Sequence, residues 1–417
     1  MLIIKGGRVI DGDIRGADVL IKDGKVAEVS ENINRPDAEI LNASGLYIAP
    51  GLVDMHVHLR EPGFEYKEDI QTGAMAAAAG GVTTCCCMPN TSPVADNAEV
   101  LAYILDKAKD AVVNILPIAA VTIGQKGEAL TDFAALRAAG AVALSDDGIP
   151  IQNAAVMRRA MQTARALDVL LISHCEDDEL AKNYAVNEGE VSRKLGLPGR
   201  PAIAEELMVM RDVMLAAETG ARIHIAHVST AGSVEIIRRA KSAGVKITAE
   251  TCPQYFTLTE DEILSKDTLA RVNPPLRTPQ DVRAIIAGLV DGTIDAIATD
   301  HAPHAAKDKN VSLPEAQSGM VGLETSLALT LTRLYHAKTL SLGQIIKLMA
   351  VNPARILGVN AGSISVGAAA DIVIFDPDEE WTVDPRQFKS KARNTPFGGM
   401  KLRGKVKRTL VGGKIVV

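Results

Sequence analysis

The stretch Gly51-Leu52-Val53-Asp54-Met55-His56-Val57-His58 joins a short apolar run to two histidines that are one residue apart. On an extended strand, alternate side chains point to the same side, so we expect His56 and His58 to face one point. This is the geometry of two ligands on one metal ion. Such pairs also occur on ordinary strands, so the choice between a metal site and a plain strand depends on the rest of the chain.

Downstream of Gly51, short apolar strands alternate with longer, alanine-rich helical segments, which favours a parallel sheet. Roughly eight such units fit before about residue 358, the number that closes a (β/α)8 barrel. The sequence therefore predicts an α/β fold, a distorted (β/α)8 TIM barrel over residues 51–359. Its clearest helices are expected at 97–109, 154–167, 204–219 and 234–243.

The two ends of the chain resemble each other in pattern. Residues 1–50 hold short alternating apolar runs separated by Gly, Asp and Asn turns, and a helix expected at 341–357 ends at Gly358. Strand patterns then return at 370–375 and 410–417. Because short isolated β segments are unstable, we expect residues 1–50 and 360–417 to pair into one small composite β-sandwich domain beside the barrel.

Composition and charge restrict the classes of molecule that the chain is expected to bind. The chain has 417 residues, 47% of them hydrophobic, and its net charge of -6 contains no long run of one sign. No nucleic-acid surface and no polybasic membrane patch is indicated, so a small molecule or another protein is the expected partner, with a small-molecule substrate favoured. A homo-oligomer is the expected assembly. Residues 70–95 carry no charge, but Gly and Pro interrupt them, and a helix, turn and buried strand is favoured over a membrane span.

The cysteines favour a reducing compartment. Five cysteines in a chain of this length, with no secretory signal at its start, do not make a disulfide framework, and the cytoplasm is the expected location. Cys85, Cys86 and Cys87 are consecutive, and neighbouring strand residues face opposite ways, so they cannot converge on one metal. We interpret them as small buried apolar residues.

Further candidate ligands stand where apolar runs stop, which is where parallel barrel strands present functional groups. His174, His227 and Asp300 each end such a run. His224 lies three residues before His227 and would face the opposite way, so we place it under the helices and outside the site. His336 is likewise interpreted as a surface or hydrogen-bonded histidine.

Histidine and aspartate are the ligands of catalytic zinc, and a zinc ion with an open position lowers the pKa of its bound water to about 7. A single histidine at a strand end is more often structural. Histidines and a carboxylate converging on one rim instead indicate metal-assisted hydrolysis.

The chain resembles the amidohydrolase superfamily and, within it, the class I dihydroorotases. The resemblance spans essentially the whole chain, and its motifs occur in the order of that family. These motifs are 54–63 (DMHVHLREPG), 88–91 (MPNT), 145–148 (SDDG), 174–177 (HCED), 227–230 (HVST), 271–277 (RVNPPLR), 298–304 (ATDHAPH) and 352–355 (NPAR).

The resemblance implies a zinc centre in which His56, His58 and Asp300 hold one metal and His174 and His227 face a second. Many relatives bridge the two metals with a carboxylated lysine, but residues 141–149 contain no lysine. Asp147 is the available bridge and Asp146 the less favoured stand-in. Either one or two zinc ions (Zn2+) per chain are compatible with so short a bridge.

The resemblance also implies a substrate pocket. Arg60 can grip a carboxylate with two parallel hydrogen bonds, although a surface ion pair is its plainer role. By similarity, Asn90 and His304 complete the carboxylate pocket, while Asn273 and the loop near Gly319 contact the ring. Residues 315–320 depart from the family, because Gln317-Ser318-Gly319 stands where relatives often carry Pro-Phe-Gly; Ser318 could donate a hydrogen bond instead.

The reaction implied is the reversible cyclisation of N-carbamoyl-L-aspartate to L-dihydroorotate in de novo pyrimidine (UMP) biosynthesis. In ring opening, hydroxide attacks the ring amide carbonyl, and Asp300 takes the proton and delivers it to the leaving nitrogen. A hydantoinase or allantoinase activity is the alternative. A non-catalytic partner of aspartate transcarbamoylase should lack several ligands, which this chain retains, and association of an active enzyme with the transcarbamoylase stays open.

Overall fold

The computed structural model describes residues 1–182 and 184–417. Within them, eight parallel strands form one sheet in the order β15-β14-β13-β10-β9-β8-β7-β6. A parallel bridge from Val57 to His301, beyond β15, brings the two edges together. The strands are β6 (Leu52–Val57), β7 (Val82–Cys87), β8 (Asn114–Ala119), β9 (Ala143–Ser145), β10 (Leu171–Ser173), β13 (Ile223–Ile225), β14 (Ile247–Thr251) and β15 (Ala296–Ile297).

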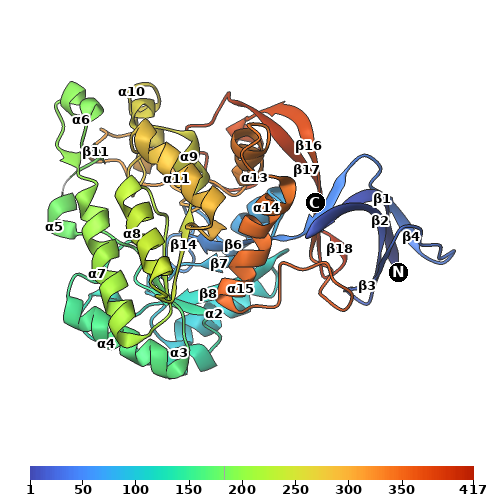
Figure 1. Ribbon diagram of the computed structural model, residues 1–417, viewed down its shortest axis with the longest axis horizontal. Helices are drawn as coiled ribbons and strands as arrows, with labels where there is room; N and C mark the ends of the chain where they lie inside the picture. Colours follow the sequence, from blue (N-terminus) through green and yellow to red (C-terminus); the bar gives the residue numbers. More distant parts are fainter. Residues whose placement is uncertain (183) are drawn as a thin grey trace.

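Helices surround this sheet (Figure 1), and the prediction of a (β/α)8 barrel is confirmed. The main ones are α1 (Ile70–Ala79), α2 (Ala98–Ala108), α3 (Phe133–Ala138), α4 (Ala154–Leu167), α7 (Ile203–Thr219), α8 (Ala231–Ser242), α11 (Pro279–Asp291), α13 (Ser326–Thr330), α14 (Leu342–Ile346) and α15 (Asn352–Leu357). Shorter elements are α5 (Asp178–Ala181), β11 (Val186–Asn187), α6 (Glu190–Leu195), β12 (Gly199–Arg200), α9 (Pro253–Thr257), α10 (Ile263–Lys266) and α12 (Ala306–Lys309).

Helix α4 shows why these segments are helical. Its first residues are capped by Asn153, whose side chain accepts hydrogen bonds from the backbone N–H groups of Ala155 and Val156. Its buried residues recur at helical spacing on one face, and the chain leaves the helix through Asp168 in the left-handed conformation. The helix expected at 154–167 is therefore found with those bounds.

Two apolar layers stabilise the barrel. One lies inside the ring of strands and the other lies between the strands and the helices. The cysteine triplet on β7 contributes side chains to both layers. Cys86 belongs to the inner cluster, whereas Cys85 and Cys87 belong to the outer one. In the described part of the chain all five cysteines are free and buried, as expected for small apolar residues.

A second sheet combines both ends of the chain, in the order β18-β17-β16-β5-β1-β2-β3, with β4 paired to β1. Figure 1 shows it beside the barrel, with both termini on that side. This confirms the composite β domain, and the boundaries near residues 50 and 360 stay a prediction. Its strands are β1 (Leu2–Asp11), β2 (Asp13–Lys22), β3 (Lys25–Ser30), β4 (Glu39–Asn42), β5 (Tyr47–Pro50), β16 (Ile372–Thr382), β17 (Lys401–Val411) and β18 (Lys414–Ile415).

Two details of this sheet differ from the prediction. Strand β4 was not expected, because its pattern is short and mostly exposed. Residues 410–417 are not one strand: β17 ends at Val411, and Gly412 and Gly413 turn the chain with positive φ into the two-residue strand β18. As to membrane spans, the described residues include no helix that is long and apolar enough to cross a bilayer.

Candidate metal centre and substrate cavity

The predicted ligands lie at the carboxyl ends of the barrel strands. His56 is in β6 and His58 directly follows it, while His174 follows β10. The others, Asp147, His227 and Asp300, stand two or three residues beyond β9, β13 and β15. Six residues from five strands thus meet although they span 245 positions of sequence, and all six are at most 6% exposed.

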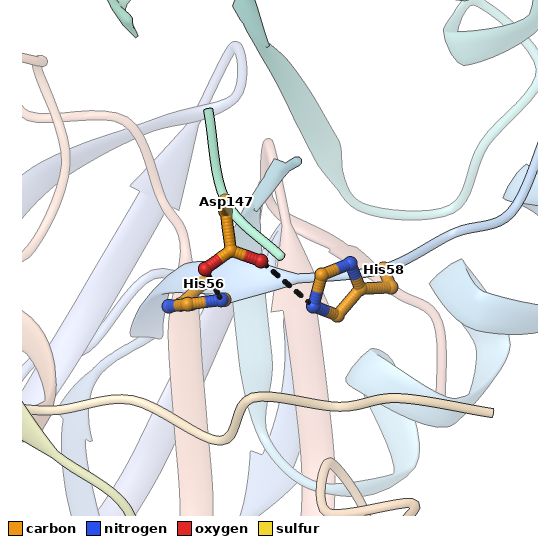
Figure 2. A group of neighbouring side chains, drawn as sticks. All are labelled: His56, His58 and Asp147. Carbon is orange, nitrogen blue, oxygen red and sulfur yellow. Dashed lines mark ion pairs between the residues drawn. The ribbon is translucent and has the colours of Figure 1, made fainter. Parts of the chain in front are cut away.

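Asp147 lies at the centre of this group. Its Oδ1 atom is 3.4 Å from His56 Nε2, and its Oδ2 atom is 3.5 Å from His58 Nε2; Figure 2 shows the carboxylate between these two rings. On its other side, Oδ1 is 3.4 Å from both His174 Nδ1 and His227 Nε2. Two groups of possible metal ligands therefore share one carboxylate.

Asp300 joins the first of these groups. Its Oδ1 atom is 3.1 Å from His58 Nε2 and 3.6 Å from His56 Nε2. Asp300 and His227 both have positive φ angles, 48° and 35°, a backbone conformation that residues other than glycine rarely adopt. Such strain is held by surrounding structure and is typical of functional sites, where it aims a side chain that a regular strand would point elsewhere.

The donor set fits a divalent metal ion. His56 Nε2 and Asp147 Oδ1 are buried without a hydrogen-bond partner, an arrangement that costs free energy unless another ligand satisfies them. Burial raises the pKa of Asp147, but the neighbouring histidines, His56 first, hold it well below its usual value. The carboxylate therefore stays ionised and can share its charge between two groups of imidazoles.

Asp146 has a different role. Its carboxylate accepts hydrogen bonds from the backbone N–H groups of Val121 (2.8 Å) and Thr122 (3.1 Å) and from the Thr122 hydroxyl. It thereby ties the end of β9 to the loop after β8. Because these bonds point it away from the histidines, Asp147 and not Asp146 occupies the position between them.

The placement of His224 under the helices was wrong. Its neighbours Ile223 and Ile225 pack against the helices, while His224 faces the barrel interior. There its Nε2 atom is 3.3 Å from Glu250 Oε2, and Glu250 Oε1 accepts a 2.8 Å hydrogen bond from His56 Nδ1–H. The strand alternation failed to account for this because the chain turns after β13, which lets His227 face the centre as well.

Glu250 is a functional residue that the sequence did not reveal. A carboxylate on one ring nitrogen fixes the tautomer of a metal-binding histidine and turns the other nitrogen toward the metal. His56 and Glu250 are both fully buried, and the contact with His224 and His56 holds the pKa of Glu250 at about 2 in spite of its burial. Its position in β14, three residues before Pro253, offered no motif to identify it.

An open cavity of about 610 Å3 begins at the metal ligands. It is lined by every residue assigned to the substrate: Arg60, Asn90, Asn273, His304, Ser318 and Gly319. Asn90 also supports a ligand, because its Oδ1 atom accepts a 2.9 Å hydrogen bond from His58 Nδ1–H. The predicted pocket residues are thus brought together beside the predicted ligands.

One wall of the cavity is cationic. His304 donates from Nε2 to the carbonyl of Ser318 (2.9 Å), so its Nδ1 accepts from Lys67 Nζ at 3.3 Å. Arg60 lies on the other side and donates to the carbonyl of Pro303. Burial, followed by the charges of Arg60 and Lys67, lowers the pKa of His304 to about 2, so this histidine is neutral. The two cations flank it.

Sequence reasoning missed Lys67, which lines the same cavity and has an 11% exposed side chain. It also missed the group that holds Asn273. Glu176 Oε2 accepts from Asn273 Nδ2 at 3.1 Å and lies 3.7 Å from His174 Nε2, while Arg200 bonds both Glu176 and Asn273. Glu176 lay within a quoted motif, but only the fold shows that it links a ligand to the pocket.

This barrel, with its shared carboxylate and imidazole ligands at the carboxyl rim, defines a metal-dependent hydrolase of the amidohydrolase type. Comparison with known proteins gives the family. A model described as "Dihydro-orotase-like" matches residues 45–233. The chain is 54% identical to the dihydroorotase of Pelotomaculum thermopropionicum and 52% identical to that of Acetivibrio thermocellus, over 100% of this chain and 98% and 99% of theirs. It therefore belongs to the dihydroorotase family and is a cyclic amide hydrolase.

Solved structures agree on the fold. The L-hydantoinase (dihydropyrimidinase) of Arthrobacter aurescens superposes with a TM-score of 0.90 at 28% identity, covering 100% of this chain and 96% of that one. A D-hydantoinase gives a TM-score of 0.89 at 25% identity, with 100% and 95% covered. Related cyclic amide hydrolases thus share this barrel and its composite β domain.

Proposed function

We propose that this chain is a zinc-dependent dihydroorotase that interconverts L-dihydroorotate and N-carbamoyl-L-aspartate in pyrimidine biosynthesis. The observation that carries the proposal is the cationic wall of the cavity, where Arg60 and Lys67 flank a neutral His304 beside the metal ligands. L-Dihydroorotate is a cyclic amide that carries a carboxylate. A hydantoin ring lacks that carboxylate and would offer no anion to the guanidinium of Arg60, whereas Lys67 already lies 3.8 Å from Asp308 Oδ2.

His56, His58, Asp147, His174, His227 and Asp300 would hold the metal, with Asp147 as the bridge if two zinc ions bind. When bound, the zinc would supply a water of lowered pKa and polarise the ring carbonyl. Imidazole and carboxylate donors with a shared oxygen suit zinc, and the donor set has room for either one or two ions.

The chain's own residues perform the remaining steps. Arg60 grips the substrate carboxylate through its guanidinium, and Lys67 adds a second positive charge from the other side of His304. Asn90 and His304 complete the carboxylate pocket, while Asn273 and the loop near Gly319 contact the ring. Asp300 accepts the proton of the attacking water and delivers it to the ring nitrogen as the amide bond breaks, so that this nitrogen leaves as the NH2 of the ureido group. Ring closure reverses these transfers.

The loop at Ser318 decides between this proposal and a hydantoinase or allantoinase. Ser318 lines the cavity at the position where an apolar residue would pack on the substrate ring. Its carbonyl oxygen already accepts a hydrogen bond from His304 Nε2–H. We infer that the loop still accepts dihydroorotate, because Arg60 and Lys67 line the same cavity as Ser318 and stay open to a substrate carboxylate there. A scaffold role is disfavoured since all six ligands meet. Association with aspartate transcarbamoylase stays a prediction, as does a cytoplasmic location.

The test measures ring opening of L-dihydroorotate, hydantoin, allantoin and dihydrouracil, which is the same ring without the carboxylate. Zinc content is determined on the same protein, before and after chelation and reconstitution. We expect chelator-sensitive turnover that is selective for dihydroorotate. Selective opening of hydantoin or allantoin would move the substrate assignment to the alternative, and zinc-free inactive protein would favour the scaffold.

Arg60→Gln tests the carboxylate anchor. A hydrogen bond to a charged group contributes about 1.5–3 kcal/mol, so KM for dihydroorotate should rise ~10- to 100-fold with a smaller change in kcat. The activity toward dihydrouracil should stay unchanged, which controls for damage to the metal centre. Arg158→Gln, an exposed arginine on α4, is the matched variant that should leave both substrates unaffected.

A further inference from the structure

A second cavity lies behind the cationic wall of the substrate cavity. Lys67 and His304 line both spaces, so this wall separates them. The second space, which we call the outer cavity, is also lined by Tyr66, Ala306, Lys309, Lys391 and Arg393. Its volume of about 370 Å3 lies within the range of about 300–1,000 Å3 that small-molecule sites occupy. Among the described residues that line it there is no metal ligand, so the reaction proposed above leaves this cavity without a role.

The charges around the outer cavity are unbalanced. Four cations line it, whereas among the described residues no aspartate or glutamate does. These cations are Lys67, Lys309, Lys391 and Arg393. Outside the lining, Asp69 is paired with Lys391, and Asp308 Oδ2 is 3.8 Å from Lys67 Nζ, which is beyond hydrogen-bond distance. The lining therefore carries more positive charge than these carboxylates neutralise, which favours an anionic ligand.

Lys309 is the most buried of these cations. The residue is 3% exposed, and its ammonium donates to the carbonyls of Arg271 at 3.2 Å and Gln317 at 2.7 Å. An ammonium has three N–H groups, so one is left to donate. Burial, followed by the charge of Arg271, lowers the pKa of Lys309 to about 7. A buried cation without a counter-charge is costly, and an anion in the outer cavity would offset that cost.

Arg393 and Tyr66 provide a recognition edge and a flat face. Arg393 Nη1 donates to the carbonyls of Ser390 and Ala392, while among the described residues its Nε and Nη2 atoms have no hydrogen-bond partner. This edge of a guanidinium binds two oxygens of a phosphate at once. Tyr66 is 51% exposed, and the ammonium of Lys307 lies 4.1 Å from the centre of its ring. The ring offers a face for the organic part of a ligand beside a further positive charge.

We propose that the outer cavity binds a phosphate dianion, free or as the end of a phosphate monoester, and that this ligand weakens binding of the substrate carboxylate. The cations come from three separate segments. Lys67 precedes α1, Lys309 ends α12 and Arg393 precedes β17. The several acceptor oxygens of a phosphate point in different directions, so one ion can bind donors from all three segments. A carboxylate has only two oxygens, in one plane with its carbon.

Lys67 couples the two cavities. Its Nζ atom is 3.3 Å from His304 Nδ1, in the wall that faces the substrate. A phosphate in the outer cavity would attract this ammonium outward and place negative charge behind His304. Both effects reduce the attraction for a carboxylate in the substrate cavity, and the coupling is reciprocal. The coupling rests on the proposed function, whereas the binding of phosphate does not.

Calorimetric titration of the full-length, zinc-loaded protein with orthophosphate and with phenyl phosphate tests the site. We expect one site per chain with a Kd of about 1 mM or lower. Ala306→Glu adds a carboxylate to the lining at an exposed residue, and Arg393→Gln removes the guanidinium edge. Each should weaken Kd ~10-fold or more, whereas the uncharged Ala306→Gln, the matched control, should stay within about threefold of wild type.

The two probes distinguish the sources of the phosphate. Tighter binding of phenyl phosphate would identify a monoester whose ring lies on Tyr66, and equal or tighter binding of orthophosphate would identify the free ion. Either result supports the proposal. No binding of either probe would overturn it. Binding that neither Ala306→Glu nor Arg393→Gln weakens would also overturn it, because the phosphate would then lie elsewhere, as on the zinc.

Kinetics test the coupling. Saturating orthophosphate should raise KM for L-dihydroorotate ~5-fold or more in wild type, with kcat unchanged, and should have no such effect in Arg393→Gln. Arg393 does not line the substrate cavity, so without phosphate this variant should match wild type. An equal rise of KM in Arg393→Gln would place the competition at the metal centre and overturn the coupling. Phosphate binding in a protein that does not open dihydroorotate would contradict the proposed function and leave the outer site standing.

Discussion

Replacing Glu250 with glutamine tests whether a buried carboxylate tunes the metal centre through His56. Glutamine has the same shape, and its carbonyl oxygen can still accept from His56 Nδ1–H. Its amide group can donate to His224 Nε2, because His224 Nδ1–H is free to bond Thr248 at 2.8 Å. The substitution therefore removes the negative charge while leaving the hydrogen bonds possible.

The size of the effect follows from the contact between Glu250 and His56. The hydrogen bond is 2.8 Å long and neither residue is exposed, so water cannot compensate for the loss of the negative charge. A hydrogen bond to a charged group contributes about 1.5–3 kcal/mol and a neutral one about 1, so we expect a loss of about 1–2 kcal/mol. This equals ~5- to 30-fold in metal affinity, which overlaps the lower part of the ~10- to 100-fold range known for such supporting carboxylates.

The assay is competition for zinc between the protein and a fluorescent chelator at fixed pH, with the melting temperature measured alongside. Glu324→Gln is the matched control, because this carboxylate is also largely buried but bonds the backbone N–H groups of Lys389 and Ser390 and no metal ligand. An affinity of Glu250→Gln within about twofold of both wild type and control would refute the reasoning, since the charge would then contribute nothing.

Three further predictions concern individual carboxylates. Asp300→Ala should lower turnover ~100-fold or more even at zinc saturation, and a rate within about tenfold of wild type would exclude the proton-transfer role. Asp146→Asn should bind zinc as wild type does, whereas Asp147→Asn should lose it, as metal analysis after dialysis will show; equal losses would contradict the assignment of the central position to Asp147. Burial raises the pKa of the Glu324 carboxyl in the folded protein to about 7. Protonation of Glu324 therefore stabilises the fold fully at pH values below the pKa of this carboxyl in the unfolded chain, and this stabilisation is lost as the pH rises through about 7. Glu324→Gln should therefore gain stability relative to wild type between pH 5 and 8, by on the order of 1–2 kcal/mol in urea unfolding, and a pH-independent difference would exclude this titration.

Much of the fold was predictable because its signals are local. The helix at 154–167 has both a capping asparagine and helical spacing of apolar residues, and these depend only on nearby sequence. Strand β4 was missed because its four residues are mostly exposed and gain their order from pairing with β1. A short edge segment without an apolar face leaves no local pattern to recognise.

The residues of the candidate site also fall into two groups, those that the local sequence identified and those that only contacts through space identify. His56 and His58 were recognised from their spacing, and Asp147, Asp300 and Arg60 from their motifs. Glu250 and Lys67 were missed because their importance lies in what they contact: His56 is 194 positions from Glu250, and His304 is 237 positions from Lys67. His224 was misplaced because strand alternation was extended past Ile225, where the regular strand ends.

The sequence by itself therefore determined the barrel, the composite β domain and the family, and it proposed the candidate ligands, since these follow from periodicity, turn residues and motifs along the chain. Only the tertiary structure decided which aspartate stands between the histidines, which charges flank His304, and that a second cationic cavity lies behind it. The physical reason is that a ligand set, an electrostatic wall and a cavity are defined by distances through space. Closing the barrel converts separations of up to 244 residues between these ligands into contacts of 3–4 Å.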